Sequence, residues 1–229
     1  MKKKLVISTG AGISAESGIS TFRDTDGLWE NYNVMDVASA DGFRRNPELI
    51  HKFYNDRRAQ LAAVQPNTAH KALAELEKDF EVNIITQNVD NLHESAGSHN
   101  VLHLHGELMT LRDINDPNFV VRFDDPNYKS SPDTVIDGRR MRPNIVFFQE
   151  PVPNIEPAIE LVREADIFVV IGTSLVVYPA AGLLQCVRPG TPVYYIDPHP
   201  AAVPSWVNVI AEPATKGVAE LVKILEKQK

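Results

Sequence analysis

Lys4-Leu-Val-Ile-Ser-Thr-Gly-Ala-Gly-Ile-Ser14 is the stretch that decides the fold of this chain. A short apolar strand, residues 5–9, runs directly into a turn bounded by Gly10 and Gly12, and small residues at 15–18 begin a helix. Glycines at such a turn let the backbone bend sharply and let a phosphate approach the amides. α/β proteins hold nucleotide diphosphates in this way. An ordinary tight turn between a strand and a helix has the same pattern, so the turn alone leaves both interpretations open.

The rest of the chain alternates predicted strands with predicted helices. Continuously apolar, β-branched runs indicate buried parallel strands at residues 5–9, 82–86, 167–171 and 193–196. The expected helices are 68–76 capped by Asn67, 155–164, one with Pro179 in its first turn, and an amphipathic one from about 217 to 227. This alternation predicts an α/β fold, with a Rossmann-like, doubly wound parallel sheet.

Two segments interrupt the alternation. Residues from about 22 to 64 form a long helical or loop excursion, and residues from about 109 to 142 are polar and rich in Asp, Asn and Pro, with only short strand-like pieces such as 119–123. A chain of 229 residues suits one core with insertions better than two equal domains. We therefore predict a single domain, residues 1–229, in which a smaller module is inserted into the sheet domain.

Bulk composition excludes some function classes. The chain is 43% apolar and 23% charged, as in ordinary globular proteins, and no apolar run is long enough to span a bilayer. The formal charge of −7 disfavours nucleic acid as a partner, because phosphate contacts need clustered Lys and Arg. The N-terminal lysines are not followed by a signal-peptide core. We expect a cytoplasmic protein with no membrane partner.

Cysteine usage limits metal and disulfide chemistry. Cys186 is the sole cysteine, so an intramolecular disulfide and a four-cysteine zinc site are both impossible. It stands in the apolar, helix-like pattern 180–187, which predicts a small core residue.

Polar side chains follow the predicted strand 82–86. Gln87, Asn88 and Asp90 stand where ligands bind in such sheets, beyond the carboxyl end of a strand. An amide can both donate to and accept from a ribose, and a carboxylate stabilises a developing positive charge. A helix N-cap made by Asn88 or Asp90 is the structural alternative, and this segment alone favours it.

Two further segments offer functional groups. His103 and His105 alternate, so they face the same side if the segment is a strand, but no third metal ligand stands at an obvious spacing. Gly172-Thr-Ser174 follows the strand 167–171, where the glycine admits close approach and the hydroxyls can bond a ribose or a phosphate. A Ser/Thr helix cap is again the alternative.

The order of these motifs closely resembles the sirtuin family of NAD-dependent protein-lysine deacylases. The resemblance covers nearly the whole chain. It rests on residues 10–14, Phe22-Arg-Asp24, Thr86-Gln-Asn-Val-Asp-Asn-Leu-His93, Leu104-His-Gly-Glu-Leu108, Asn144-Ile-Val-Phe-Phe148 and Gly172-Thr-Ser-Leu175.

The resemblance implies an NAD site built from many loops. The matching positions are Gly10, Ala11, Gly12, Ile13, Ser14, Phe22, Arg23, Gln87, Asn88, Val89, Asp90, Gly172, Thr173, Ser174, Asp197, Pro198, His199 and Ala214. Asp197 departs from the usual Asn of the family. Sirtuins carry a zinc ribbon where this chain has residues 109–142, but no cysteine stands there, so we expect NAD without zinc.

The resemblance also implies a mechanism and a substrate. Asn88 and Asp90 would orient and stabilise a cationic ribose as nicotinamide leaves, and His105 would act as general base, which an imidazole pKa near 6.5 permits. The products would be free lysine, nicotinamide and O-acyl-ADP-ribose. Protein ADP-ribosylation, NAD hydrolysis and NAD sensing without turnover remain alternatives, although a sensor needs no base.

Substrate residues are implied in the same way. In sirtuins the substrate peptide pairs as a strand between the segments that match 148–150 and 175–178 here, and Val146, Phe147 and Phe148 would bind it. Gln149 replaces the family's usual glycine, which we expect to narrow or re-aim the groove.

Tyr54 and Arg57 share one face of a helix that begins near Pro47, and together they can hold a carboxylate. The alternative is a packed tyrosine beside a solvated arginine. Sirtuins that remove succinyl and malonyl groups carry this Tyr-x-x-Arg pair and a small residue earlier in the chain, which is matched here by Ala38. The resemblance therefore predicts desuccinylase and demalonylase activity beside deacetylation.

Overall fold

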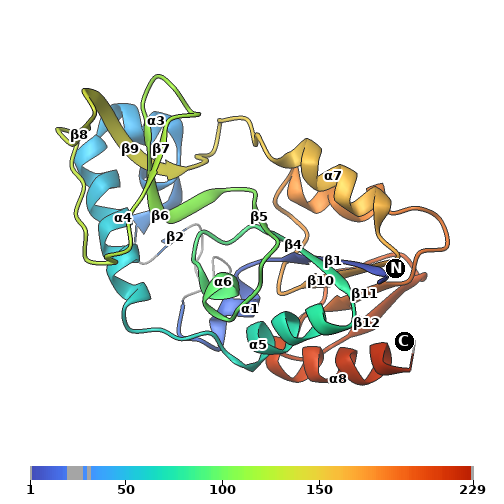
Figure 1. Ribbon diagram of the computed structural model, residues 1–229. Coiled ribbons are helices and arrows are strands. Elements are labelled where there is room, and N and C mark those ends of the chain that lie inside the picture. The colour runs from blue at the N-terminus through green and yellow to red at the C-terminus, as the bar shows by residue number, and fades with distance from the viewer. Residues whose placement is uncertain (1, 20–27, 30–31, 228–229) are drawn as a thin grey trace.

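A six-stranded parallel sheet forms the larger lobe of the computed structural model, which describes residues 2–19, 28–29 and 32–227 (Figure 1). The strand order is β12-β11-β10-β1-β4-β5, and each neighbouring pair is parallel. The strands are β1 (Lys4–Thr9), β4 (Glu81–Thr86), β5 (Val101–His103), β10 (Ile167–Ile171), β11 (Val193–Ile196) and β12 (Val207–Ile210). The predicted α/β fold with a doubly wound parallel sheet is confirmed.

Strand residues alternate between two hydrophobic cores. Leu5 and Ile7 of β1 face the core that contains α5 (Thr68–Glu75) and α8 (Ala214–Glu226), whereas Val6 faces the core beneath α7 (Ile155–Glu164). A side-chain period of two places successive residues on opposite faces, so covering both faces requires strands that are apolar throughout. Figure 1 shows α7 on one side of the sheet and α5 and α8 on the other. In the described ranges, no helix is long and apolar enough to cross a bilayer.

Several predicted helices differ in their bounds or type. The first helix, α1, spans Gly12–Ala15 rather than 15–18. The last, α8, begins at Ala214 instead of about 217, because the amides of Lys216 and Gly217 already bond to the carbonyl of Pro213. Ala180–Cys186 is a 3-10 helix preceded by Pro179.

Cys186 lies half-buried at the edge of the core, not within it. The short 3-10 helix that carries it leaves the side chain at the periphery. Asn67 caps α5 as predicted, because its side chain accepts hydrogen bonds from the amides of Ala69 and His70.

The two interrupting segments come together as a smaller lobe. Its helices are α2 (Val34–Val37), α3 (Ala40–Arg45) and α4 (Pro47–Leu61). Its antiparallel sheet has the order β7-β6-β9-β8, with β6 (Gly106–Asp113), β7 (Val120–Arg122), β8 (Val135–Ile136) and β9 (Arg139–Ile145). The remaining short elements are β2 (Leu28–Trp29), β3 (Tyr32–Asn33), η1 (Leu76–Lys78) and α6 (Leu92–Ser95).

The strands β6 and β9 are longer than the short pieces expected at 109–142. β9 carries three arginines and a proline, so its sequence lacks the apolar alternation that marks a strand. Its partners in the sheet and the core of the smaller lobe override that local signal.

Packing and hydrogen bonds hold the smaller lobe together. Arg58 of α4 is fully buried, and its guanidinium donates to the carbonyls of Leu108 and Tyr128 and lies 4.6 Å from the centre of the Phe123 ring. These bonds tie the helices to the antiparallel sheet. A zinc ribbon does not fit this chain, because Cys186 lies in the other lobe.

We expect the smaller lobe to be independent of zinc. Elemental analysis of the purified protein should find no stoichiometric zinc, and treatment with EDTA should leave both the urea midpoint and the activity unchanged. A stoichiometric metal, or a chelator-induced drop in the midpoint, would contradict this expectation.

Candidate active site

A backbone contact between two loops forms the floor of the site. A Cβ at Gly12 would lie 2.6 Å from the Cα of Gly172, and a Cβ at Gly10 would lie 2.7 Å from the Gly172 carbonyl oxygen. Gly172 itself has a φ of +62°, which favours glycine. The amides of Gly10 and Gly12 donate to the carbonyls of Ile171 and Gly172. These glycines therefore serve loop–loop contact, and their own amides are already bonded within the protein.

Asn88, Asp90 and Ser14 form one buried hydrogen-bond network on that floor. The Asn88 side-chain amide donates to the carbonyl of Gly10 at 3.1 Å and to Ser14 Oγ at 3.2 Å. Ser14 Oγ in turn donates to Asp90 Oδ2 at 3.1 Å. The network joins the loop after β4 to the first turn of α1, so both loops hold these polar groups in fixed places.

The capping alternative is partly correct for Asp90. Its Oδ1 accepts a hydrogen bond from the amide of Leu92, the first residue of α6, while Oδ2 belongs to the network. Asp90 is buried, and this burial raises the pKa of its carboxyl. A carboxylate kept in a low-dielectric site interacts strongly with any positive charge that develops beside it.

His105 and Gln87 bring the next group of side chains to the same edge. The His105 Nδ1 lies 2.9 Å from the carbonyl oxygen of Gln87, so an Nδ1–H tautomer leaves Nε2 as an acceptor. Burial lowers the pKa of His105 below its ordinary value, which favours the neutral ring. The Gln87 side chain donates to Thr173 Oγ1 at 3.4 Å and links this loop to the one after β10.

The other predicted cofactor residues lie along the same carboxyl edge of the sheet. Asp197 is buried after β11 and accepts from the amide of His199 at 2.9 Å, and Ala214 is the buried first residue of α8. Ala11, Ile13, Val89, Ser174 and Pro198 stand in or beside the same set of loops. Phe22 and Arg23 lie outside the described residues.

The predicted substrate segment runs next to His105. The amide of Val146 donates to the carbonyl of His105 at 2.9 Å. Farther along, the amide of Phe148 donates to the carbonyl of Ala38 at 2.8 Å, and the amide of Ala40 donates back to Phe148 at 3.1 Å. The segment is thus pinned between the β5–β6 connection and the end of α2, and Phe148 remains 40% exposed.

Tyr54 stacks on Phe147, which belongs to that segment. Their ring centres are 6.0 Å apart, and both side chains are buried. Arg57 lies one turn farther along α4 and is half-buried, with its guanidinium carbon 5.1 Å from the centre of the Phe53 ring. The structure therefore brings Tyr54, Phe147 and the Ala38–Phe148 pairing into one region.

Two residues of this region were not anticipated from the sequence. Arg142 of β9 lies with its guanidinium carbon 4.0 Å from the centre of the Phe147 ring and donates to Glu150 Oε1 at 2.6 Å. Glu150 also accepts from the amide of Phe147 at 2.9 Å. The pair holds the predicted substrate segment in place, and no local pattern marks it, because the residues between Arg142 and Glu150 carry no charge.

Gln149 bonds to α3 of the smaller lobe. Its backbone has a φ of +77°, and its side-chain amide donates to Asp41 Oδ2 at 2.7 Å while its oxygen accepts from the Asp41 amide. The side chain therefore joins the end of the predicted substrate segment to α3 by two hydrogen bonds.

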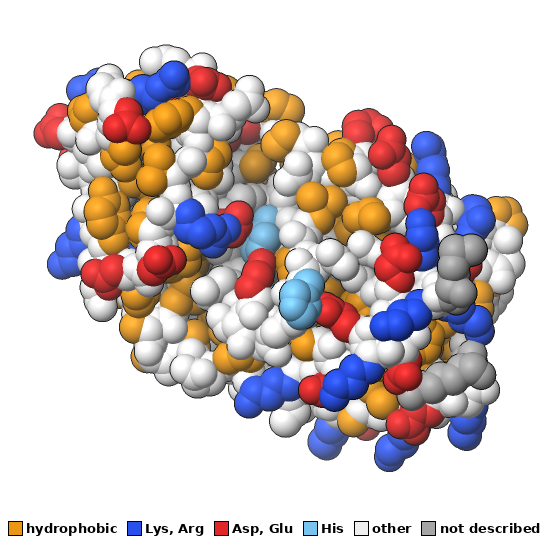
Figure 2. Space-filling view, viewed as in Figure 1, with side chains coloured by type: hydrophobic (Ala, Val, Ile, Leu, Met, Phe, Trp, Pro, Cys, Tyr) orange, Lys and Arg blue, Asp and Glu red, His pale blue; other side chains and the backbone are white. Residues whose placement is uncertain are grey.

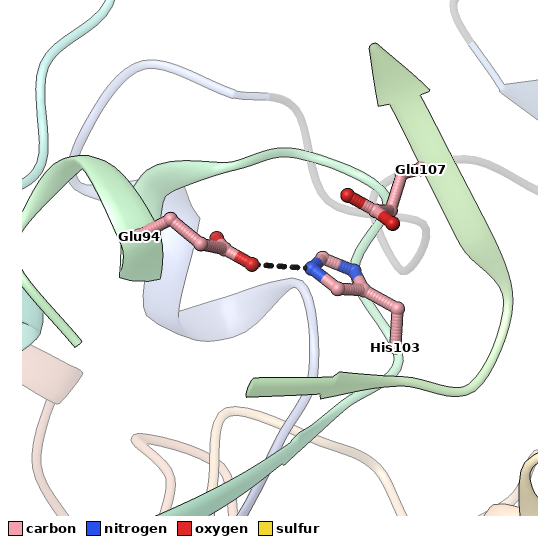
Figure 3. Close-up of side chains that lie close together, drawn as sticks. All are labelled: Glu94, His103 and Glu107. Atoms are coloured by element: carbon pink, nitrogen blue, oxygen red, sulfur yellow. Dashed lines mark hydrogen bonds and ion pairs between the residues drawn. The ribbon is translucent and has the colours of Figure 1, made fainter. Parts of the chain in front are cut away.

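One cluster has the composition of a metal site. Ligand atoms of Glu94, His103 and Glu107 lie within 4.8 Å of one another (Figure 3). His103 Nε2 already bonds to Glu94 at 2.7 Å, and Glu107 already pairs with Arg122. These internal ion pairs use the same atoms that a metal would need.

The predicted cofactor residues and the predicted substrate residues come together where the two lobes meet. The carboxyl ends of the strands point toward the smaller lobe (Figure 1), and Figure 2 shows a histidine at the surface between the lobes with acidic and basic groups beside it. Nucleotides bind at this edge in doubly wound sheets. The arrangement can stabilise a cation with Asp90 and accept a proton at His105.

Comparisons with known proteins agree with this arrangement. The model of the Sir2 family matches residues 10–179. An NAD-dependent protein deacylase of Bacteroides thetaiotaomicron is 52% identical over 229 residues, which cover 97% of this chain and 98% of that protein. A solved Sir2 homologue in complex with NAD has a TM-score of 0.87 at 38% identity and covers 99% of this chain and 91% of its own. A Sir2 structure with a p53 peptide and NAD+ has a TM-score of 0.78 at 30% identity and covers 98% of this chain and 94% of its own.

Proposed function

This chain belongs to the Sir2 family, and from that premise we infer how its residues share the reaction and which acyl groups it removes. It is an NAD-dependent protein deacylase. The observation that carries its mechanism is the buried network of Ser14, Asn88 and Asp90 beside a neutral His105. NAD supplies the nicotinamide leaving group and the ADP-ribose that accepts the acyl group.

The residues present fit that cosubstrate. The contact of Gly10 and Gly12 with Gly172 brings two loop backbones together at the carboxyl edge of the sheet, where doubly wound folds bind a diphosphate and its ribose. Asn88 and Asp90 are anchored to that floor, where they orient a ribose and favour positive charge on it. Because Nδ1 of His105 is bonded to the carbonyl of Gln87, its Nε2 would be the atom that takes up a proton from a ribose hydroxyl.

The products test this function directly. The protein incubated with NAD and acetyl-, succinyl- or malonyl-lysine peptides should give free lysine peptide, nicotinamide and O-acyl-ADP-ribose by mass spectrometry. Transfer of ADP-ribose to the peptide, NAD hydrolysis without deacylation, or NAD binding without turnover would each replace this conclusion by a different one.

His105→Ala should retain NAD binding and lose turnover by roughly 10²-fold or more, as expected when a general base is removed. In the wild type, the lowered pKa of His105 places the acid-side fall in kcat/KM below pH 6.5, because the ring stays neutral above it. Calorimetric titration with NAD and steady-state rates from pH 5 to 9 measure both effects. Activity within a few-fold of the wild type would contradict the assignment.

We propose further that succinyl- and malonyl-lysine are substrates. Tyr54 stacks on Phe147 of the predicted substrate segment, and Arg57 lies one turn away on the same helix face. Ala38, at the end of α2, is small and bonds to the same segment. A guanidinium and a phenol near the end of an acyl chain suit a carboxylate, and the small residue leaves room for the chain.

Arg57→Met tests that specificity. A charge-assisted hydrogen bond contributes about 1.5–3 kcal/mol, so kcat/KM for succinyl-lysine peptide should fall roughly 10- to 150-fold while that for acetyl-lysine peptide is spared. The matched control is Arg163→Met, which removes an exposed arginine of α7 in the other lobe. Equal losses on both substrates would mean that Arg57 only supports the fold.

A further inference from the structure

His103 contacts three different elements around the active site. It is the last residue of β5 and is only 8% exposed. Its Nδ1 lies 2.9 Å from the carbonyl oxygen of Asn88, and its Nε2 lies 2.7 Å from Glu94 Oε1 on α6. The carbonyl of His103 accepts from the side-chain amide of Asn154 at 2.8 Å, which anchors its own backbone.

The geometry makes His103 a cation. A carbonyl and a carboxylate are both acceptors, so each ring nitrogen must carry a proton to satisfy its partner. Figure 3 shows the carboxylates of Glu94 and Glu107 on either side of the ring. Glu107 is shared with Arg122 of β7, whereas Glu94 bonds to the imidazole directly.

The electrostatics of the surrounding groups agree. Burial alone would lower the pKa of His103. The hydrogen bond and the charge of Glu94, together with the charge of Glu107, raise that pKa overall. The reverse holds for Glu94, whose pKa would rise on burial but is lowered by His103. His93, packed nearby, has its pKa lowered by burial and so adds no charge at neutral pH.

We propose that His103 is a positioning residue of the reaction, held as an imidazolium by Glu94 so that it fixes the main chain at Asn88. The inference rests on the proposed roles of Asn88 and Asp90. Fixing the Asn88 carbonyl fixes the side chain that bonds to Gly10 and Ser14. The positive charge of His103 opposes the burial that raises the pKa of Asp90.

Two histidines thus bond to adjacent carbonyls of one loop, one as a neutral ring and the other as a cation. His105 bonds to Gln87 as a neutral ring, and His103 bonds to Asn88 as a cation. The pH profile of kcat/KM for NAD should therefore be bell-shaped. His105 sets its acid side, and loss of the His103 proton sets its alkaline side.

Glu94→Gln separates charge from shape, because the amide oxygen still accepts a hydrogen bond. Loss of a hydrogen-bonded opposite charge moves a pKa by about one unit or more, so the alkaline side should move at least that far toward neutral pH while the acid side stays in place. His103→Gln should remove the alkaline side and lower kcat/KM for NAD roughly tenfold, the effect of losing a buried hydrogen bond.

Glu77→Gln is the matched control. Glu77 forms the same kind of pair, with His99 Nδ1 at 2.7 Å, but on the exposed surface and away from the site. This variant should leave both sides of the pH profile unchanged. Urea unfolding of every variant at pH 7 and 9 shows whether lost stability accounts for lost activity.

A readout without catalysis keeps this inference separate from the proposed function. NMR titration of the His103 ring should give a pKa above the ordinary 6.5 in the wild type and a lower one in Glu94→Gln. A His103 pKa at or below 6.5 would overturn the proposal. It would also be overturned if the alkaline side of the pH profile were unchanged in Glu94→Gln, or if EDTA treatment of the wild type moved that side as far as the substitution does. Absence of deacylated product in the wild type would instead overturn the function.

Discussion

The backbone contact between the loop after β1 and the loop after β10 is the constraint on which the rest of the site depends. The two strands are neighbours in the sheet, so their loops leave the same edge side by side. Glycines at 10, 12 and 172 let the two backbones touch, and any side chain there would push them apart. This contact positions Asn88, because the Asn88 side chain donates to the carbonyl of Gly10 and to Ser14 Oγ in the loop after β1 and the helix that follows it.

The smaller lobe is attached to this edge through the short connection between β5 and β6. Gly106 has a φ of +82°, and a Cβ there would overlap the carbonyl of Asn144. The sharp turn lets His105 bond to Gln87 through its ring and to Val146 through its carbonyl. One residue therefore joins the nucleotide edge of the larger lobe to the substrate segment of the smaller one.

Local signals predicted the parts of the structure that local chemistry determines. The apolar runs gave the four central strands, Asn67 marked the start of α5, and Pro47 begins α4 at its first position. The strands β6 and β9 could not be found in this way, since β9 is polar and takes its form from its neighbours. The pairs Arg142–Glu150 and His103–Glu94 join residues that only the tertiary fold brings into register, and an exposed Glu at position 94 carries no sign of its partner.

The left-handed backbone at Gln149 has a consequence for how the groove meets a substrate. A residue with a side chain in that conformation costs on the order of 1 kcal/mol, and the two hydrogen bonds between Gln149 and Asp41 offset the cost. A glycine there would leave the segment free to sample many conformations. We expect a peptide that docks on this segment to meet an edge already ordered during folding, so that less conformational entropy remains to be lost on binding.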